Sequence, residues 1–285
     1  MERSKIENIL NKRFEKINTA FDSFRLHLME DDIRLFRVKV KKLAACLRLI
    51  NAEKNHEHAL KVPQKISKLY KIAGVIRILQ MQQKFVEKTL DRKLMVPPGT
   101  YLKIIADQIL HHIELVNKQI KGTKQFKKEE EKLLQLLPKH LREKTIQQFI
   151  FTEGDRLEKL LAPVFPADQS FHEVRELLKN LLHLSAYLEM EFSALFPYAS
   201  LDSYDHIDAF TIVLGRFHDL NAAIGHLHTE CIKAEIDENE KIVLRNMESL
   251  WMKERAAVRE EIFDHLQKII SSGRSMVPLD KWPVM

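Results

Sequence analysis

Residues 32–50 have the sequence DIRLFRVKVKKLAACLRLI, and this stretch indicates both a fold class and a kind of ligand. On a helix of about 100° per residue, its apolar side chains cover one side, and four basic ones share an arc of roughly 60°. This basic row consists of Arg34, Arg37, Lys41 and Arg48. No acidic residue follows Asp32 in the stretch to neutralise the row. The pattern predicts a helix with a buried side and an anion-binding side, the alternative being a solvated face.

Helical periodicity extends over most of the 285 residues. The chain has only seven Gly and nine Pro, and it lacks the Asn-Gly and Gly-Asn dipeptides that mark β-hairpins. Its 45% apolar and 30% charged residues are typical of a globular chain. We therefore expect an all-α protein. Helices are predicted over residues 6–29, 32–50, 63–94, 101–120, 168–196, 204–234 and 238–270, with shorter ones before residue 161.

Positive charge is concentrated in residues 33–86. This window holds 13 Lys and Arg residues and two acidic ones, a local net charge of +11, whereas the whole chain nets +6. The remainder therefore nets −5. Positive charges at this density repel one another and attract anions. This concentration of charge predicts a phosphate-rich polyanion as partner, and nucleic acid is the alternative because its phosphate backbone would meet the same charges.

Two short motifs occur once in each half of the chain. The first is R-x-x-R-x-x-x-K at residues 34–41 and H-x-x-R-x-x-x-K at residues 172–179, an offset of 138. The second is G-x-x-R at residues 74–77 and L-G-x-x-H-D at residues 214–219, with the glycines 141 apart. Two motifs at nearly one offset indicate an internal duplication.

The duplication predicts two related antiparallel helical bundles packed into one compact unit, residues 1–162 and 163–285, the second with a loose C-terminal tail. With these motifs, the chain resembles the CHAD family, helical domains named for recurrent histidines. The resemblance extends over roughly residues 24–270. It implies that inorganic polyphosphate binds in a basic channel between the halves, without catalysis. The chain departs from the family pattern at Arg34, Ile78, Asn180 and His218.

The predicted polyanion site combines the motifs with the basic row and with lysines of the helix that begins near residue 63. We expect these cations to converge on one concave surface that no carboxylate covers. If the histidines of the site lie beside phosphate, the negative charge should raise their pKa and make them cations near neutral pH. The alternative is that each is a half-buried histidine that donates a hydrogen bond to a backbone carbonyl. The candidate residues are Arg34, Arg37, Lys41, Lys42, Arg48, Lys65, Lys68, Arg77, His172, Arg175, Lys179, His183 and His218.

Catalysis is the weaker hypothesis. A metal-dependent phosphohydrolase would need clustered ligands, and no His-Glu-x-x-His motif accompanies the histidines of residues 218–228. A scaffold on anionic membranes fits the basic row poorly, because membrane-surface helices combine cations with exposed apolar side chains. We predict a binding module, not an enzyme, with no cofactor and no metal. Oligomeric state and preferred chain length are left open.

The expected location is the cytoplasm. The N-terminal residues lack a secretory signal pattern, and no run of about 18 apolar residues predicts a membrane span. Cys46 and Cys231 lie far apart in apolar periodic segments. This placement indicates buried thiols in a reducing compartment. Because no long apolar run is present, we also expect no membrane insertion of the chain.

Overall fold

The computed structural model describes residues 1–53, 59–93, 96–119, 126–162, 167–188, 201, 203–233 and 236–271. Over these ranges the regular elements are α-helices, which confirms the all-α prediction. Residue 163, the predicted start of the second half, and the predicted tail after residue 271 lie outside the described residues. The helices are α1 (Arg3–His27), α2 (Glu30–Asn51), α3 (Gln64–Lys93), α4 (Gly99–Lys118), α5 (Lys127–Gln135), α6 (Glu143–Leu161), α7 (Asp168–Leu188), α9 (Tyr204–Lys233) and α10 (Glu238–Ser271).

The first two helices form a tight hairpin. Phe21 and Phe24 of α1 pack on Phe36 of α2, with ring centroids 5.4 and 5.7 Å apart. Leu28 ends α1 in the left-handed region, with φ 55°, and its N–H donates to the carbonyl of Phe24. Three acidic residues then form the first turn of α2, where their negative charge interacts favourably with the positive end of the helix dipole. The aromatic contacts and the short turn thus set α2 antiparallel to α1.

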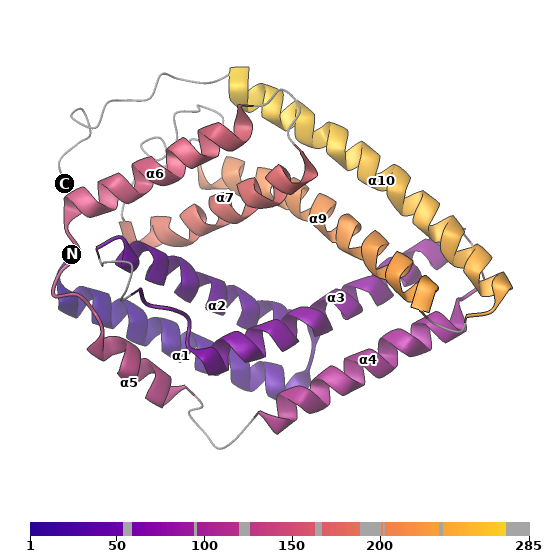
Figure 1. The fold of residues 1–285 in the computed structure, drawn as a ribbon, viewed down its shortest axis with the longest axis horizontal. Helices are drawn as coiled ribbons and strands as arrows, with labels where there is room; N and C mark the ends of the chain where they lie inside the picture. The colour runs from indigo at the N-terminus through magenta and orange to yellow at the C-terminus, as the bar shows by residue number, and fades with distance from the viewer. Residues whose placement is uncertain are drawn as a thin grey trace.

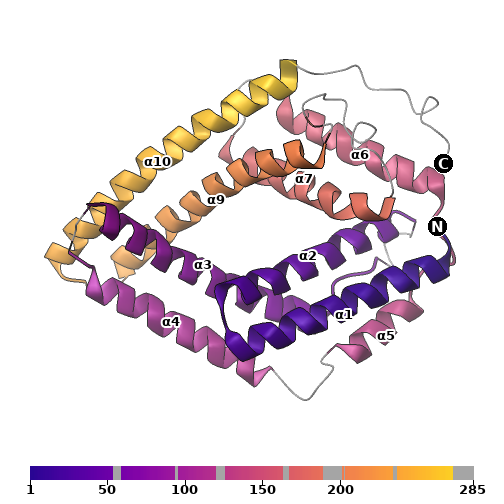
Figure 2. The same ribbon diagram turned by 180° about the vertical axis from the view of Figure 1, so that it is seen from behind.

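Four helices form a closed inner ring, in which α2 contacts α3, α3 contacts α9, α9 contacts α7 and α7 contacts α2. Figures 1 and 2 show one outer helix on the outer side of each inner one: α1 on α2, α4 on α3, α10 on α9 and α6 on α7. The short helix α5 packs on α1. The order outer, inner, inner, outer therefore occurs twice along the chain. It is the order expected of two related bundles, while the duplication itself stays a prediction.

Apolar side chains fill the contacts between inner and outer helices. Trp251 of α10 is only 2% exposed, and its indole N–H donates to the Thr89 hydroxyl of α3 at 2.9 Å. Cys46 of α2 is a buried free thiol, as predicted, and burial raises its pKa to about 11. The side chain of Cys231 lies outside the described residues. Each outer helix thus buries one apolar stripe and leaves its polar side to solvent.

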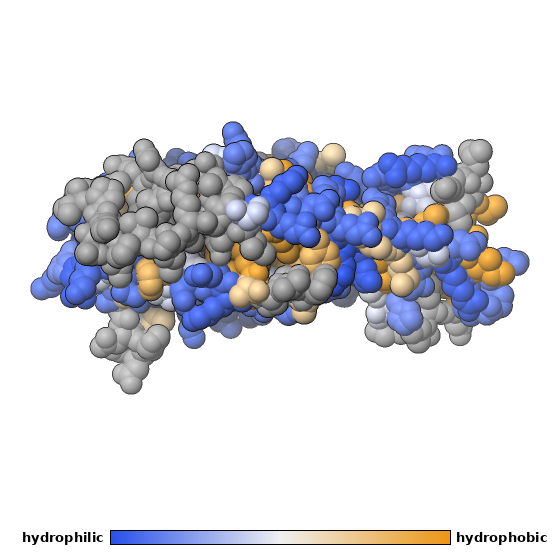
Figure 3. All heavy atoms as spheres, turned by 90° about the horizontal axis from the view of Figure 1, so that it is seen from above, coloured by the Kyte–Doolittle hydropathy of each residue, from blue (hydrophilic) through white to orange (hydrophobic). Residues whose placement is uncertain are grey.

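The molecule is flat. Figure 3 views it from the edge and shows a mostly hydrophilic surface with separate hydrophobic patches. None of the described helices is both long and apolar enough to cross a membrane.

Two glycines let an arginine of the neighbouring inner helix lie against the helix backbone. A Cβ atom at Gly74 of α3 would overlap with Nη1 of Arg37 of α2. That nitrogen donates to the carbonyl of Tyr70 at 3.0 Å, and the guanidinium lies 4.4 Å from the centre of the Tyr70 ring. In the second half, a Cβ at Gly215 of α9 would lie 3.3 Å from Nε of Arg175 of α7. In both halves, the arginine of the first motif therefore packs on the glycine of the second.

Replacing Gly74 should separate this packing role from ordinary helix propensity. A Cβ at Gly225 meets nothing within 4 Å, so Gly225→Ala should raise the free energy of unfolding by about 0.5–1 kcal/mol. In Gly74→Ala, the methyl group displaces Arg37 from Tyr70. The lost hydrogen bond should make this variant about 1–2 kcal/mol less stable than Gly225→Ala in urea unfolding. Equal stabilisation by both alanines would contradict the role of Gly74.

Candidate functional site

The basic row of α2 reaches across to α7. Lys41 Nζ donates to Glu176 Oε1 at 2.9 Å, and Arg175 Nη1 donates to the same oxygen at 3.3 Å. Burial opposes ionisation of Glu176, yet Lys41, Arg175 and His172 together hold the pKa of its carboxyl below the ordinary value. Two candidate cations from different halves of the chain thus meet at one carboxylate.

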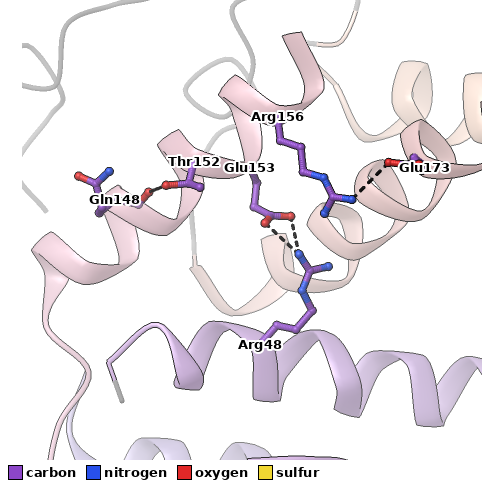
Figure 4. A network of polar contacts seen from close by, with 6 residues as sticks. All are labelled: Arg48, Gln148, Thr152, Glu153, Arg156 and Glu173. Carbon is purple, nitrogen blue, oxygen red and sulfur yellow. Dashed lines mark hydrogen bonds and ion pairs between the residues drawn. The ribbon is translucent and has the colours of Figure 1, made fainter. Parts of the chain in front are cut away.

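Arg48, near the end of α2, points toward α6. Its Nη2 atom lies 2.9 and 2.8 Å from the two carboxylate oxygens of Glu153. Figure 4 shows this pair beside Arg156 and Glu173, which join α6 to α7 at 3.5 Å. The Glu153 side chain is only 9% exposed, and a buried carboxylate requires such a partner. Arg48 therefore has a structural role between α2 and α6.

Lys179 and Arg77 are paired in the same way. Lys179 Nζ donates to Asp208 Oδ1 of α9 at 2.7 Å, and Arg77 pairs with Glu30 in the first turn of α2. The expectation that no carboxylate covers the candidate cations is wrong at five positions: Lys41, Arg48, Arg77, Arg175 and Lys179. The partners of Lys41, Arg48, Arg77 and Lys179 come from other helices, so the pattern of the cationic stretch alone does not reveal them.

The two motif histidines of the second half lie against each other. The rings of His172 of α7 and His218 of α9 have centroids 4.9 Å apart and planes inclined by 29°. Desolvation, followed by the charges of His172 and Arg175, lowers the pKa of His218. Burial raises the pKa of Asp219, although Arg175 and Arg77 oppose this effect. These groups therefore share the contact between α7 and α9, and Asp219 lies within electrostatic reach of two motif arginines.

A second group of cations lies along α1 and α2. We call Arg13 and Lys16 of α1, together with Lys39 and Lys42 of α2, the cationic cluster. The pKa of Lys42 is lowered first by burial and then by the charges of Arg13, Lys39, Lys16 and Lys179. Burial, Lys16 and Arg13 likewise lower the pKa of Lys39. The neighbouring charges that shift the pKa of both lysines are those of other cations.

Sequence reasoning missed three of the four cluster residues and included only Lys42. Arg13 is 9% exposed, and burial lowers its pKa. The sequence does contain a signal for the cluster: Arg13 and Lys16 on one predicted helix, and Lys39 and Lys42 on the next, each pair three residues apart. Only the hairpin of α1 and α2 brings the two pairs together.

His183 of α7 borders the cationic cluster. Burial, followed by Lys42, Lys179, Lys41 and Arg13, lowers its pKa from 6.5 to about 4. The imidazole is therefore neutral at pH 7 in the chain by itself. The prediction that it becomes a cation applies when an anion offsets those four positive charges.

The remaining candidates, Lys65, Lys68 and Arg34, lie away from the cationic cluster and from the contacts of α2 with α7. Lys65 Nζ of α3 lies 5.8 Å from the centre of the Phe126 ring, and Lys65 lines a cavity of about 420 Å³ beside α5. Lys68 is exposed and lies about half a turn around α3 from Arg77, whose partner Glu30 belongs to the inner ring. Arg34 is exposed near the start of α2. The predicted site thus divides into paired cations, outlying cations and the surroundings of Lys42.

The histidines considered for a metal site lie in different surroundings. His226 Nδ1 is 3.2 Å from the Tyr101 hydroxyl, in a partly buried contact, and desolvation lowers the pKa of His226. His228 Nδ1 lies 3.6 Å from a carboxylate oxygen of Glu248. In the part of the chain that the structure describes, no three His, Cys, Asp or Glu side chains are grouped to hold one metal ion.

The family model for the CHAD domain matches residues 8–228, and the chain therefore belongs to the CHAD family, as its motifs predicted. Its fold is similar to the crystal structure of the CHAD domain from the plant Ricinus communis, with TM-score 0.71 and 15% identity over 94% of this chain and 92% of that chain. It is also similar to PptA from Streptomyces chartreusis, with TM-score 0.70 and 14% identity over 94% and 99%. No curated protein matches the sequence.

The substitution His183→Gln should change the pH dependence of stability. The pKa of His183 is about 4 in the folded chain against an ordinary 6.5, so the unfolded chain gains a proton first as the pH falls. The folded state therefore loses stability between pH 6.5 and about 4, whereas above that range the imidazole is neutral in both states. Glutamine does not titrate, so the variant should lose less stability over this interval. Urea unfolding at several pH values measures the effect, and equal pH slopes for both proteins would disprove it.

Proposed function

We propose that this CHAD domain binds inorganic polyphosphate, or a similar linear polyanion, at the cationic cluster and the adjoining part of α7, without hydrolysing it. The observation behind this proposal is that burial and neighbouring cations lower the pKa of both Lys39 and Lys42. Positive charges that destabilise one another are all stabilised by an anion that brings negative charge close to them.

The arrangement of the cations suits a chain of phosphates better than a single phosphate. Lys42 is influenced both by Arg13 of α1 and by Lys179 of α7, so one field extends over three helices. Lysine acts as a point charge, which permits contact with a flexible chain in more than one register. Affinity should come largely from released counterions and should fall steeply as salt is added.

Family membership supports the same class of ligand, because CHAD domains are associated with polyphosphate binding in general. In this chain several motif cations already have partners inside the protein: Arg37 on Tyr70, and Lys41 and Arg175 on Glu176. We therefore propose that these residues hold the inner helices together before a ligand binds. The cationic cluster is assigned the first contact with the ligand.

Nucleic acid is the competing ligand, since its phosphates would meet the same cluster. Proteins that bind single strands also stack bases on exposed aromatic side chains. Among the exposed large hydrophobic side chains of the described residues the one aromatic is Tyr204, which is 51% exposed and opens α9. The helices of the cationic cluster therefore offer charge without a stacking surface, which favours polyphosphate.

The double substitution Lys39→Gln with Lys42→Gln should weaken polyphosphate binding by about 10-fold or more, because two charge-assisted contacts are lost. The logarithm of the affinity should also depend less steeply on the logarithm of the salt concentration. Titration calorimetry at several salt concentrations measures both effects. The matched control is Lys253→Gln with Lys268→Gln, which removes the same charge from exposed positions of α10. An equal loss in both double variants would argue against a site at the cluster.

Competition should separate polyphosphate from nucleic acid. Long-chain polyphosphate should displace a labelled oligonucleotide at a lower phosphate concentration than unlabelled DNA or RNA does, at physiological salt, because it has more charge per length and needs no stacking. The displaced polyphosphate should keep its chain length on a gel and release no orthophosphate. Stronger competition by nucleic acid would favour the alternative ligand, and orthophosphate release would show an enzyme.

A further inference from the structure

Glu176 is an anion of the protein placed among the cations of the motifs. It lies on α7, and one of its carboxylate oxygens accepts hydrogen bonds from Lys41 of α2 at 2.9 Å and from Arg175 at 3.3 Å. His172, one turn earlier on α7, adds to the positive field at this carboxylate. The oxygen is therefore bound by a lysine and an arginine with a histidine nearby, which is a donor set that also binds a phosphate oxygen.

We propose that Glu176 occupies the place of one phosphate group, and that a bound polyanion displaces this carboxylate from Lys41 and Arg175. The proposal rests on the proposed function, and it adds an internal competitor to it. The Glu176 side chain is 35% exposed, so its carboxylate has access to water when the ligand takes its donors.

The other internal carboxylates do not share this position. Glu153 is 9% exposed and contacts Arg48 through both oxygens, so leaving that pair would strand a buried charge. Asp208 pairs with Lys179 of α7 at 2.7 Å. Glu176 is set apart because it is half-exposed and is held by cations of both α2 and α7.

An internal competitor makes binding depend on the length of the ligand. A long chain can stay anchored at the cationic cluster, which includes Lys42, the residue after Lys41, while one of its phosphates displaces Glu176. This second contact is then intramolecular and has a high effective concentration. A short anion has fewer contacts elsewhere with which to offset the separation of Glu176 from its cations. Displacing Glu176 is therefore a cost that a long chain overcomes with its other contacts, whereas a short anion stays largely unbound at the same concentration.

The test is the affinity for tripolyphosphate and the affinity for long-chain polyphosphate, both measured by titration calorimetry on the full chain. In Glu176→Gln, tripolyphosphate should bind roughly 10-fold more tightly than in the natural chain, because an uncharged amide competes weakly for two cations. Long-chain polyphosphate displaces the same carboxylate, so its affinity should rise by a similar factor. The matched control is Glu261→Gln, which removes the same charge from an exposed pair with Arg216 at 3.0 Å.

The outcomes separate this inference from the proposed function. If the natural chain binds long-chain polyphosphate but Glu176→Gln leaves the affinity for tripolyphosphate unchanged or lowers it, Glu176 is no competitor. An equal gain in Glu261→Gln would also overturn the inference, because net charge would explain it. A natural chain that binds no polyphosphate refutes the proposed function. If Glu176→Gln does not fold, Glu176→Asp replaces it; its retracted carboxylate should produce a smaller gain for tripolyphosphate, and no gain would again overturn the inference.

Discussion

A charged group that is partly removed from water needs an opposite charge, a hydrogen bond or a ligand, and the inner ring of helices depends on meeting this requirement. Arg48 meets it at Glu153 of α6, and Lys179 meets it at Asp208 of α9. Arg37 meets it at the carbonyl of Tyr70, which the absence of a side chain at Gly74 allows. Each contact joins two helices, so neutralising these cations also sets the distances between α2, α3, α6, α7 and α9.

The cationic cluster meets the requirement differently. Lys39 and Lys42 have lowered pKa values because burial and neighbouring cations both disfavour their charged form. In our proposal, a polyanion brings negative charge close to Lys39 and Lys42. Cations paired with a carboxylate and cations of the cluster are then neighbours on the same helix, as Lys41 and Lys42 show. Lys41 has a carboxylate partner at 2.9 Å, and the charges that lower the pKa of Lys42 are those of other cations.

Much of the fold could be predicted from the sequence. Apolar residues at helical spacing, together with few glycines and prolines, indicate the helices, and the acidic first turn of α2 marks a helix start. The two motifs also identified the family, because an arginine that packs on a glycine leaves a recognisable residue at each position. Packing between inner and outer helices follows from the apolar stripes once these helices exist.

The candidate site was only partly predictable, and charge pairing explains why. The sequence by itself determined the helical class, the family and the concentration of positive charge in residues 33–86, since these depend on composition and on spacing along one helix. The tertiary structure decided which cations have partners: it placed Glu176 on Lys41, and it joined Arg13 and Lys16 of α1 to Lys42 of α2. Electrostatic interaction depends on distance in space, and helices far apart in the sequence become neighbours only when their apolar faces are buried together.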